Sequence, residues 1–100
     1  MALDQENMQI LNLVQAMLGS ITPSIRQVSV ALSSVGVRLY FVLEGDSSSD
    51  REEIEDIVFE FEALQSSQVG VDVEVLVDMR PLHKLGLPGR LVYSRTEPDL

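Results

Sequence analysis

Carboxylates are the side chains of this 100-residue sequence that are most able to do chemistry. There are 16 acidic residues against 7 basic ones, which gives a formal net charge of −9. Asp72 and Glu74 alternate with valines, so we expect both to project from one face of a strand. Asp46 follows an earlier apolar run, and carboxylates gathered from neighbouring strands can hold Mg²⁺. These three residues are one candidate site, although a solvated outer sheet face explains Asp72 and Glu74 more simply.

The residues needed for other catalytic chemistry are missing. The sequence has no cysteine and a single histidine, His83. A nucleophilic relay needs an anchored nucleophile and an orienting acid beside the histidine, and the sequence offers only serines without such partners. Residues 86–89 (GLPG) have a proline where a phosphate-binding loop needs backbone N–H groups. We therefore expect neither an enzyme nor a bound cofactor.

The acidic residues concentrate in residues 44–62, which carry nine acids and one base, Arg51. Short polar residues at 46–49 are typical of a helix start, and Ser49 with Glu52 fits a capping box. Apolar residues then recur at helical spacing and predict a buried stripe of Ile54, Ile57, Val58, Phe61 and Leu64. The opposite face of the helix carries Glu52, Glu55, Asp56 and Glu60, together with Phe59.

An aromatic residue among acids has two interpretations. Phe59 either packs against a neighbouring loop at the edge of the helix or anchors a protein interface. The acidic charge favours a basic protein partner, because the field of the protein would speed the encounter. Solubility alone is the simpler explanation of the charge. Nucleic acid as a direct ligand is excluded, since phosphate binding needs a basic surface.

Six elements are expected to position these residues. Residues 4–18 predict a helix that Gly19 ends, with Ile10, Leu11, Val14, Met17 and Leu18 on its apolar side. Alternation of period two predicts strands from Ile25, from Val37 to Leu43 and from Val71 to Val77, with a short last strand at 91–93. The acidic helix lies between the second and third strands.

The order α-β-β-α-β-β predicts one α+β domain over residues 1–100, a two-layer sandwich with both helices on one face of a mainly antiparallel sheet. The acidic helix could instead form a right-handed parallel crossover between the second and third strands. No signal peptide or membrane-spanning run is found, so we expect a cytoplasmic protein without membrane contact. Residues 79–96 hold four bases and no acid, and either pair with acids within the fold or bind something acidic.

Three short stretches form a pattern that covers most of the chain. Residues 18–28 (LGSITPSIRQV) contain G-x-[IV]-[ST]-P-x-[IL]-R-x-V, and residues 41–46 (FVLEGD) an aromatic-x-x-acid-Gly-acid step. Residues 89–97 (GRLVYSRTE) fit G-x-[LM]-V-[YF]-x-R-x-E. Together they resemble small bacterial immunity proteins of contact-dependent growth inhibition and related polymorphic toxin systems. The loop at 80–88 (RPLHKLGLP) departs from that pattern and leaves the class of toxin open.

The resemblance implies a non-enzymatic inhibitor that occludes a toxin domain, often a basic nuclease, by presenting carboxylates where phosphates would bind. The residues expected to form this partner-binding surface are Asp46, Glu52, Glu55, Asp56, Phe59 and Glu60. The alternative is a degenerate nucleotidyltransferase-like protein that holds Mg²⁺ with Asp46, Asp72 and Glu74, although the Gly-Ser motif of that family is missing. Weak homodimerisation is also left open.

Overall fold

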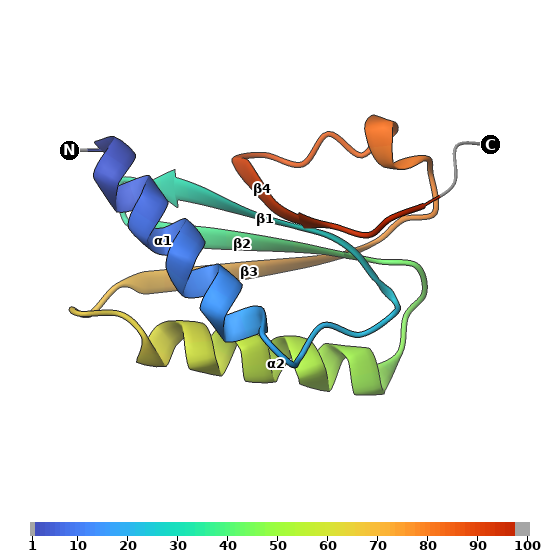
Figure 1. The fold of residues 1–100 in the computed structure, drawn as a ribbon, viewed down its shortest axis with the longest axis horizontal. Coiled ribbons are helices and arrows are strands. Elements are labelled where there is room, and N and C mark those ends of the chain that lie inside the picture. The colour runs from blue at the N-terminus through green and yellow to red at the C-terminus, as the bar shows by residue number, and fades with distance from the viewer. Residues whose placement is uncertain (1, 98–100) are drawn as a thin grey trace.

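A computed structural model describes residues 2–97 and contains the six expected elements with one additional short helix (Figure 1). The elements are α1 (Ala2–Met17), β1 (Ile25–Ser33), β2 (Gly36–Leu43), α2 (Ser48–Ala63), β3 (Gly70–Val77), the 3₁₀ helix η1 (Leu82–Lys84) and β4 (Arg90–Ser94). The predicted α+β class and the order of helices and strands are confirmed.

The four strands form one mixed sheet in the order β3-β2-β1-β4. The β1–β2 hairpin and the β1–β4 pair are antiparallel, whereas β2 and β3 are parallel and in register from Gly36 opposite Gly70 to Leu43 opposite Val77. The sheet is therefore only partly antiparallel, and the alternative of a parallel crossover is correct. The physical reason is α2: a helix between two neighbouring strands returns the chain to the end of the sheet where the first strand began.

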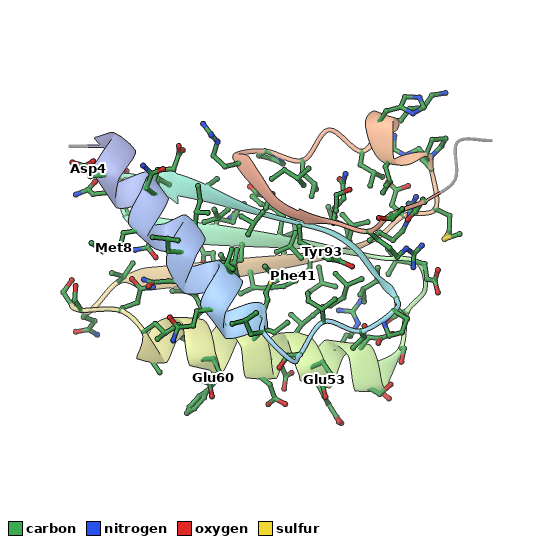
Figure 2. All side chains as sticks on the ribbon, in the orientation of Figure 1. Asp4, Met8, Phe41, Glu53, Glu60 and Tyr93 are labelled. Atoms are coloured by element: carbon green, nitrogen blue, oxygen red, sulfur yellow. The ribbon has the colours of Figure 1, made fainter. Side chains whose placement is uncertain are left out.

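The core lies between the sheet and the two helices. Figure 1 shows α1 crossing the face of the sheet and α2 running roughly along the strands. Leu13 and Met17 of α1 join Ile57 and Phe61 of α2 in one buried cluster with β1 and β2. Phe41 of β2 is fully buried in this cluster and lies between the layers in Figure 2. Both helices thus cover the same face of the sheet.

The buried face of α1 differs from the predicted one. The structure buries Leu13, Ala16 and Met17, while Leu11 and Leu18 stay 69% and 73% exposed. This orientation of α1 is favoured by Ala16, whose small side chain allows a close approach to the core. It also buries Gln9, whose amide is satisfied by Gln65. Each of these two side chains donates an N–H to the other, at 2.8 and 2.9 Å. Helix α1 carries apolar residues on several of its sides, so their spacing alone did not identify the face that is buried.

The connection from β3 to β4 has to cross the sheet, since these strands lie at opposite edges. It crosses the face away from the helices, where the Ser29 hydroxyl donates a hydrogen bond to the carbonyl oxygen of Pro88 at 2.8 Å. Gly89, directly before β4, has a φ of 78°, and a Cβ there would lie 2.2 Å from the carbonyl oxygen of Val30. Only glycine fits this close approach between the two backbones.

Candidate functional site

Helix α2 begins at a serine cap that lies two residues before the predicted one. Ser47 is the N-cap, and its hydroxyl accepts a hydrogen bond from the backbone N–H of Asp50 at 3.5 Å. The predicted box of Ser49 and Glu52 is therefore wrong, and the same spacing is met by Ser47 and Asp50 instead. Several serines in succession offered more than one cap.

The buried face of α2 fixes which residues point to solvent. Ile54, Ile57 and Phe61 are buried against the sheet, as predicted, and Val58 is half-buried at the flank. The opposite side is therefore exposed along the whole helix, and it carries the predicted carboxylates of Glu52, Glu55, Asp56 and Glu60. Figure 2 shows Glu53 and Glu60 on the side of α2 away from the sheet.

Phe59 is 70% exposed, so the structure does not place it against a loop at the helix edge. Helical spacing puts Glu55 and Asp56 one turn before it and Glu62 one turn after it. All three carboxylates are exposed. An aromatic ring in water, surrounded by negative charge, contributes little to the fold. Such residues are enriched where proteins bind each other.

Most of these carboxylates are unpaired. Within residues 2–97, none of the carboxylates of Glu52, Glu55, Asp56 and Glu60 takes part in an ion pair. Asp46 differs, because its carboxylate accepts a hydrogen bond from Arg51 Nε at 2.7 Å. Asp46 is exposed and lies just before the helix. It is therefore nearest to the acids at the start of α2, and part of its charge is already balanced by Arg51.

A shallow groove runs beside this acidic surface, between α2 and the edge strand β3. It encloses about 360 Å³ and is lined by Arg51, Ile54, Glu55, Val58, Val73 and Val75. Val73 is 40% exposed, so the apolar face of β3 is not fully covered by α2. The acidic surface therefore borders an open apolar strip.

The alternative magnesium site is not assembled. The register places Asp72 beside Arg38 and Glu74 beside Tyr40, whereas Asp46 follows the far end of β2. Asp72 forms an exposed ion pair with Arg38 at 3.7 Å. In the part of the chain that the structure describes, no three His, Cys, Asp or Glu residues come together as metal ligands. His83 lies exposed on η1, away from these acids.

The structure contains a second charged cluster that was not predicted from the sequence. The Arg26 guanidinium, almost fully buried, donates to both carboxylate oxygens of Glu97 at 2.7 and 2.9 Å, and to the carbonyl oxygen of Asp78 at 2.6 Å. Arg95 pairs with Glu97 at 2.9 Å and with Glu44 at 3.0 Å. The hydrogen bond from Arg26 is the main reason that the pKa of Glu97 is lowered to about 2.

Arg26, Glu44, Arg95 and Glu97 form one ion-pair cluster. The basic segment at residues 79–96 takes part in it through Arg95, and two more of its bases pair elsewhere within the fold. Arg95 is used within the fold, Arg80 pairs with Asp78 at 2.6 Å, and Arg90 lies 3.6 Å from Glu6. The three stretches that form the sequence pattern supply all four members of the cluster. The residues themselves stand in the sequence pattern, as Arg26 and as the Arg-x-Glu of residues 95–97. Because Arg26 and Glu97 are 71 residues apart, the pattern alone did not indicate that they are in contact.

No helix within residues 2–97 is long and apolar enough to cross a membrane. A family model described as MafI2 immunity protein matches residues 6–97, which covers most of α1, all of α2, the whole sheet and the ion-pair cluster. No curated protein matches the chain.

Proposed function

Because the chain belongs to the MafI2 immunity protein family, we propose that it neutralises a basic toxin domain by covering that domain with the exposed side of α2. The family implies a toxin-neutralising immunity role, which is a binding role and not a catalytic one. It also confirms the resemblance to small bacterial immunity proteins of polymorphic toxin systems. The proposed surface, called the acidic face below, consists of Asp46, Glu52, Glu55, Asp56, Phe59 and Glu60.

The observation that carries the proposal is the 70% exposure of Phe59 among carboxylates that form no ion pair within residues 2–97. Unpaired surface charges act at a distance, so they speed the approach of a basic partner. An exposed aromatic side chain contributes after contact, because its apolar surface is removed from water only when the complex forms. The two kinds of residue together give fast association and slow release.

The chemistry of the acidic face also suggests the kind of toxin. A nuclease binds the phosphates of its substrate with basic side chains, and rows of carboxylates can occupy the same positions. Helix α2 carries seven acids and one base between Ser48 and Ala63. We therefore take the target to be a nuclease-type domain, which this protein would meet in the cytoplasm, where the nucleic acid substrates lie.

The test starts with capture of the toxin from a lysate of the source cell and its identification by mass spectrometry. The purified toxin domain is then titrated calorimetrically with the wild type and with Phe59→Ala. A buried interface aromatic contributes about 2 kcal/mol or more, so Phe59→Ala should weaken binding by about thirtyfold. Leu11→Ala, at an equally exposed apolar residue on α1, is the matched control and should bind like the wild type.

Melting curves separate binding from folding. Phe59 is exposed, so Phe59→Ala should unfold at nearly the wild-type temperature. Equal losses of affinity and of thermal stability would mean that Phe59 supports the fold and would remove it from the acidic face. Unchanged affinity in Phe59→Ala would reject the proposed surface as a whole.

Neutral substitutions test the carboxylates. The double variant Glu52→Gln and Asp56→Asn should bind the toxin more weakly, and its affinity should fall less steeply as salt rises, because fewer ionic contacts remain to be screened. The control is Asp72→Asn with Glu74→Gln, which removes the same charge from the opposite sheet face. If both double variants lose affinity equally, net charge and not the acidic face drives binding.

A further inference from the structure

An apolar stripe on the outer side of α1 has no partner in the part of the chain that the structure describes. Met8, Leu11, Val14 and Leu18 are 53%, 69%, 40% and 73% exposed. Met8, Leu11 and Val14 recur every three residues along one side of α1, and Leu18 follows in the turn after the helix. The stripe extends over roughly 15 Å, at 1.5 Å per helical residue. Folding alone does not account for four large side chains exposed in a row.

The groove beside this stripe is uncharged, and on the stripe's side of α1 the nearest charge along the helix is Asp4, one turn before Met8. Three stretches of the sequence lack any Asp, Glu, Lys, Arg or His, at residues 7–25, 27–37 and 63–71. Residues from all three stretches line a groove of about 370 Å³. The elements that form it, α1, the β1–β2 turn and the segment after α2, lie at the same end of the molecule in Figure 1. Met8 belongs to both the groove and the stripe. None of the eleven residues that line the groove is charged.

We propose that this neutral surface, formed by the α1 stripe and the adjoining groove, is the interface at which two copies of the chain form a symmetric homodimer. The inference does not depend on the proposed function. It assigns the surface to a second copy because of the distribution of charge. No charged residue lines the groove, so a basic partner would form no ion pair inside it.

A second copy is the partner that this surface fits. Each copy carries a net charge of −9, so two copies repel each other wherever their acidic sides come close. The neutral surface is the place where that repulsion is smallest and where apolar contact is available. In a two-fold dimer the same stripe serves both partners, so each apolar side chain contributes twice. The acidic faces on the two α2 helices then remain free for the toxin.

The charge pattern predicts an unusual response to salt. Added salt screens the repulsion between two acidic copies, so dimerisation should strengthen as NaCl rises. The toxin contact proposed above should weaken under the same change. Sedimentation equilibrium of the wild type from micromolar to millimolar concentrations, at low and at raised NaCl, measures the dimer dissociation constant and its salt dependence.

Two variants of equal exposure separate the two surfaces. Leu11→Gln keeps good helix propensity and should weaken the dimer by about tenfold or more, because the side chain is buried on both sides of the interface. Phe59→Gln should leave the dimer unchanged. Leu11 and Phe59 are 69% and 70% exposed, so neither substitution should lower the melting temperature much, and circular dichroism confirms that both variants are folded.

The outcomes are distinct. A wild-type dimer that Leu11→Gln dissociates and Phe59→Gln retains supports the inference. A monomer at every concentration and salt, or a dimer that Leu11→Gln leaves intact, overturns it. A loss of toxin affinity in Leu11→Gln with a monomeric wild type would overturn it too, because the stripe would then bind the toxin. Loss of toxin binding in Phe59→Ala bears only on the acidic face, so the two proposals can fail separately.

Discussion

At the scale of single residues, the charges of this protein have two different roles. The carboxylates of Glu52, Glu55, Asp56 and Glu60 on α2 are exposed and form no ion pair within residues 2–97, whereas Arg26 and Glu97 are held in fixed geometry by each other. Arg26 donates to β3 through the carbonyl oxygen of Asp78 and to the chain beyond β4 through Glu97. One side chain of β1 thus holds the ends of both edge strands. The paired charges stabilise the fold, and the unpaired ones are available to a partner.

The ionised carboxylate of Glu97 makes the stability of the fold depend on pH. Its pKa falls from 4.5 to about 2 on folding, mainly because Arg26 donates to the ionised carboxylate. A lowered folded-state pKa stabilises the protein above the unfolded value, and this stabilisation is lost as pH falls from about 4.5 towards 2. Glu97→Gln should therefore melt below the wild type at neutral pH, with a difference that shrinks across this acid range.

The matched control for this prediction is Glu60→Gln, at an exposed carboxylate without an ion-pair partner in the described part of the chain. It should not melt below the wild type at neutral pH when unfolding is followed by circular dichroism, because no ion pair is lost. A Glu97→Gln protein whose deficit stays constant down to pH 2 would show that packing, and not the ionised pair with Arg26, is what the substitution removes.

At the scale of elements, the start of α2 decides how the acidic face is presented. Ser47 caps the helix through a long hydrogen bond of 3.5 Å. Ser47→Ala should therefore cost about 0.5 to 1 kcal/mol, at the lower end of the usual range for a lost N-cap. For a domain of this size that lowers the melting temperature by about 2 to 8 °C.

Ser49→Ala is the control that separates the two possible caps. Ser49 lies inside the first turn of α2, where alanine is well tolerated, so thermal unfolding should hardly change. If Ser49→Ala destabilises the protein more than Ser47→Ala does, the helix starts at the later serine, as the sequence alone suggested.

The elements also show what a single sequence can and cannot predict. The acidic side of α2 was predicted correctly, because its apolar residues define one face and its acids the other. The inner face of α1 was not, since Leu11 and Leu18 are as apolar as Leu13 and only tertiary packing distinguishes them. The parallel pairing of β2 with β3 stayed an alternative because their spacing fits either direction. The Arg26–Glu97 pair was invisible, since nothing local marks residues that far apart as neighbours.

At the scale of the whole molecule, charge is divided among separate regions. The α2 side is strongly acidic, the end around the β1–β2 turn is neutral, and the opposite end holds the ion-pair cluster. This arrangement allows two interfaces with opposite responses to salt, one for a basic toxin and one for a second copy. It also concentrates repulsion in one element, because Glu52, Asp56 and Glu60 follow each other at four-residue spacing on α2.

The same concentration of charge predicts how the stability of the folded protein depends on salt. Like charges one helical turn apart destabilise α2, and at physiological ionic strength the screening length is about 8 Å. Raising NaCl at neutral pH should therefore raise the melting temperature, because exposed repulsion is screened more than the nearly buried Arg26–Glu97 pair. Asp56→Asn removes the middle charge of the row and should make this rise smaller. A melting temperature that falls with salt would mean that surface ion pairs such as Arg80–Asp78 stabilise the protein more than the repulsion destabilises it. The exposed acids of α2 would then have no measurable cost in stability.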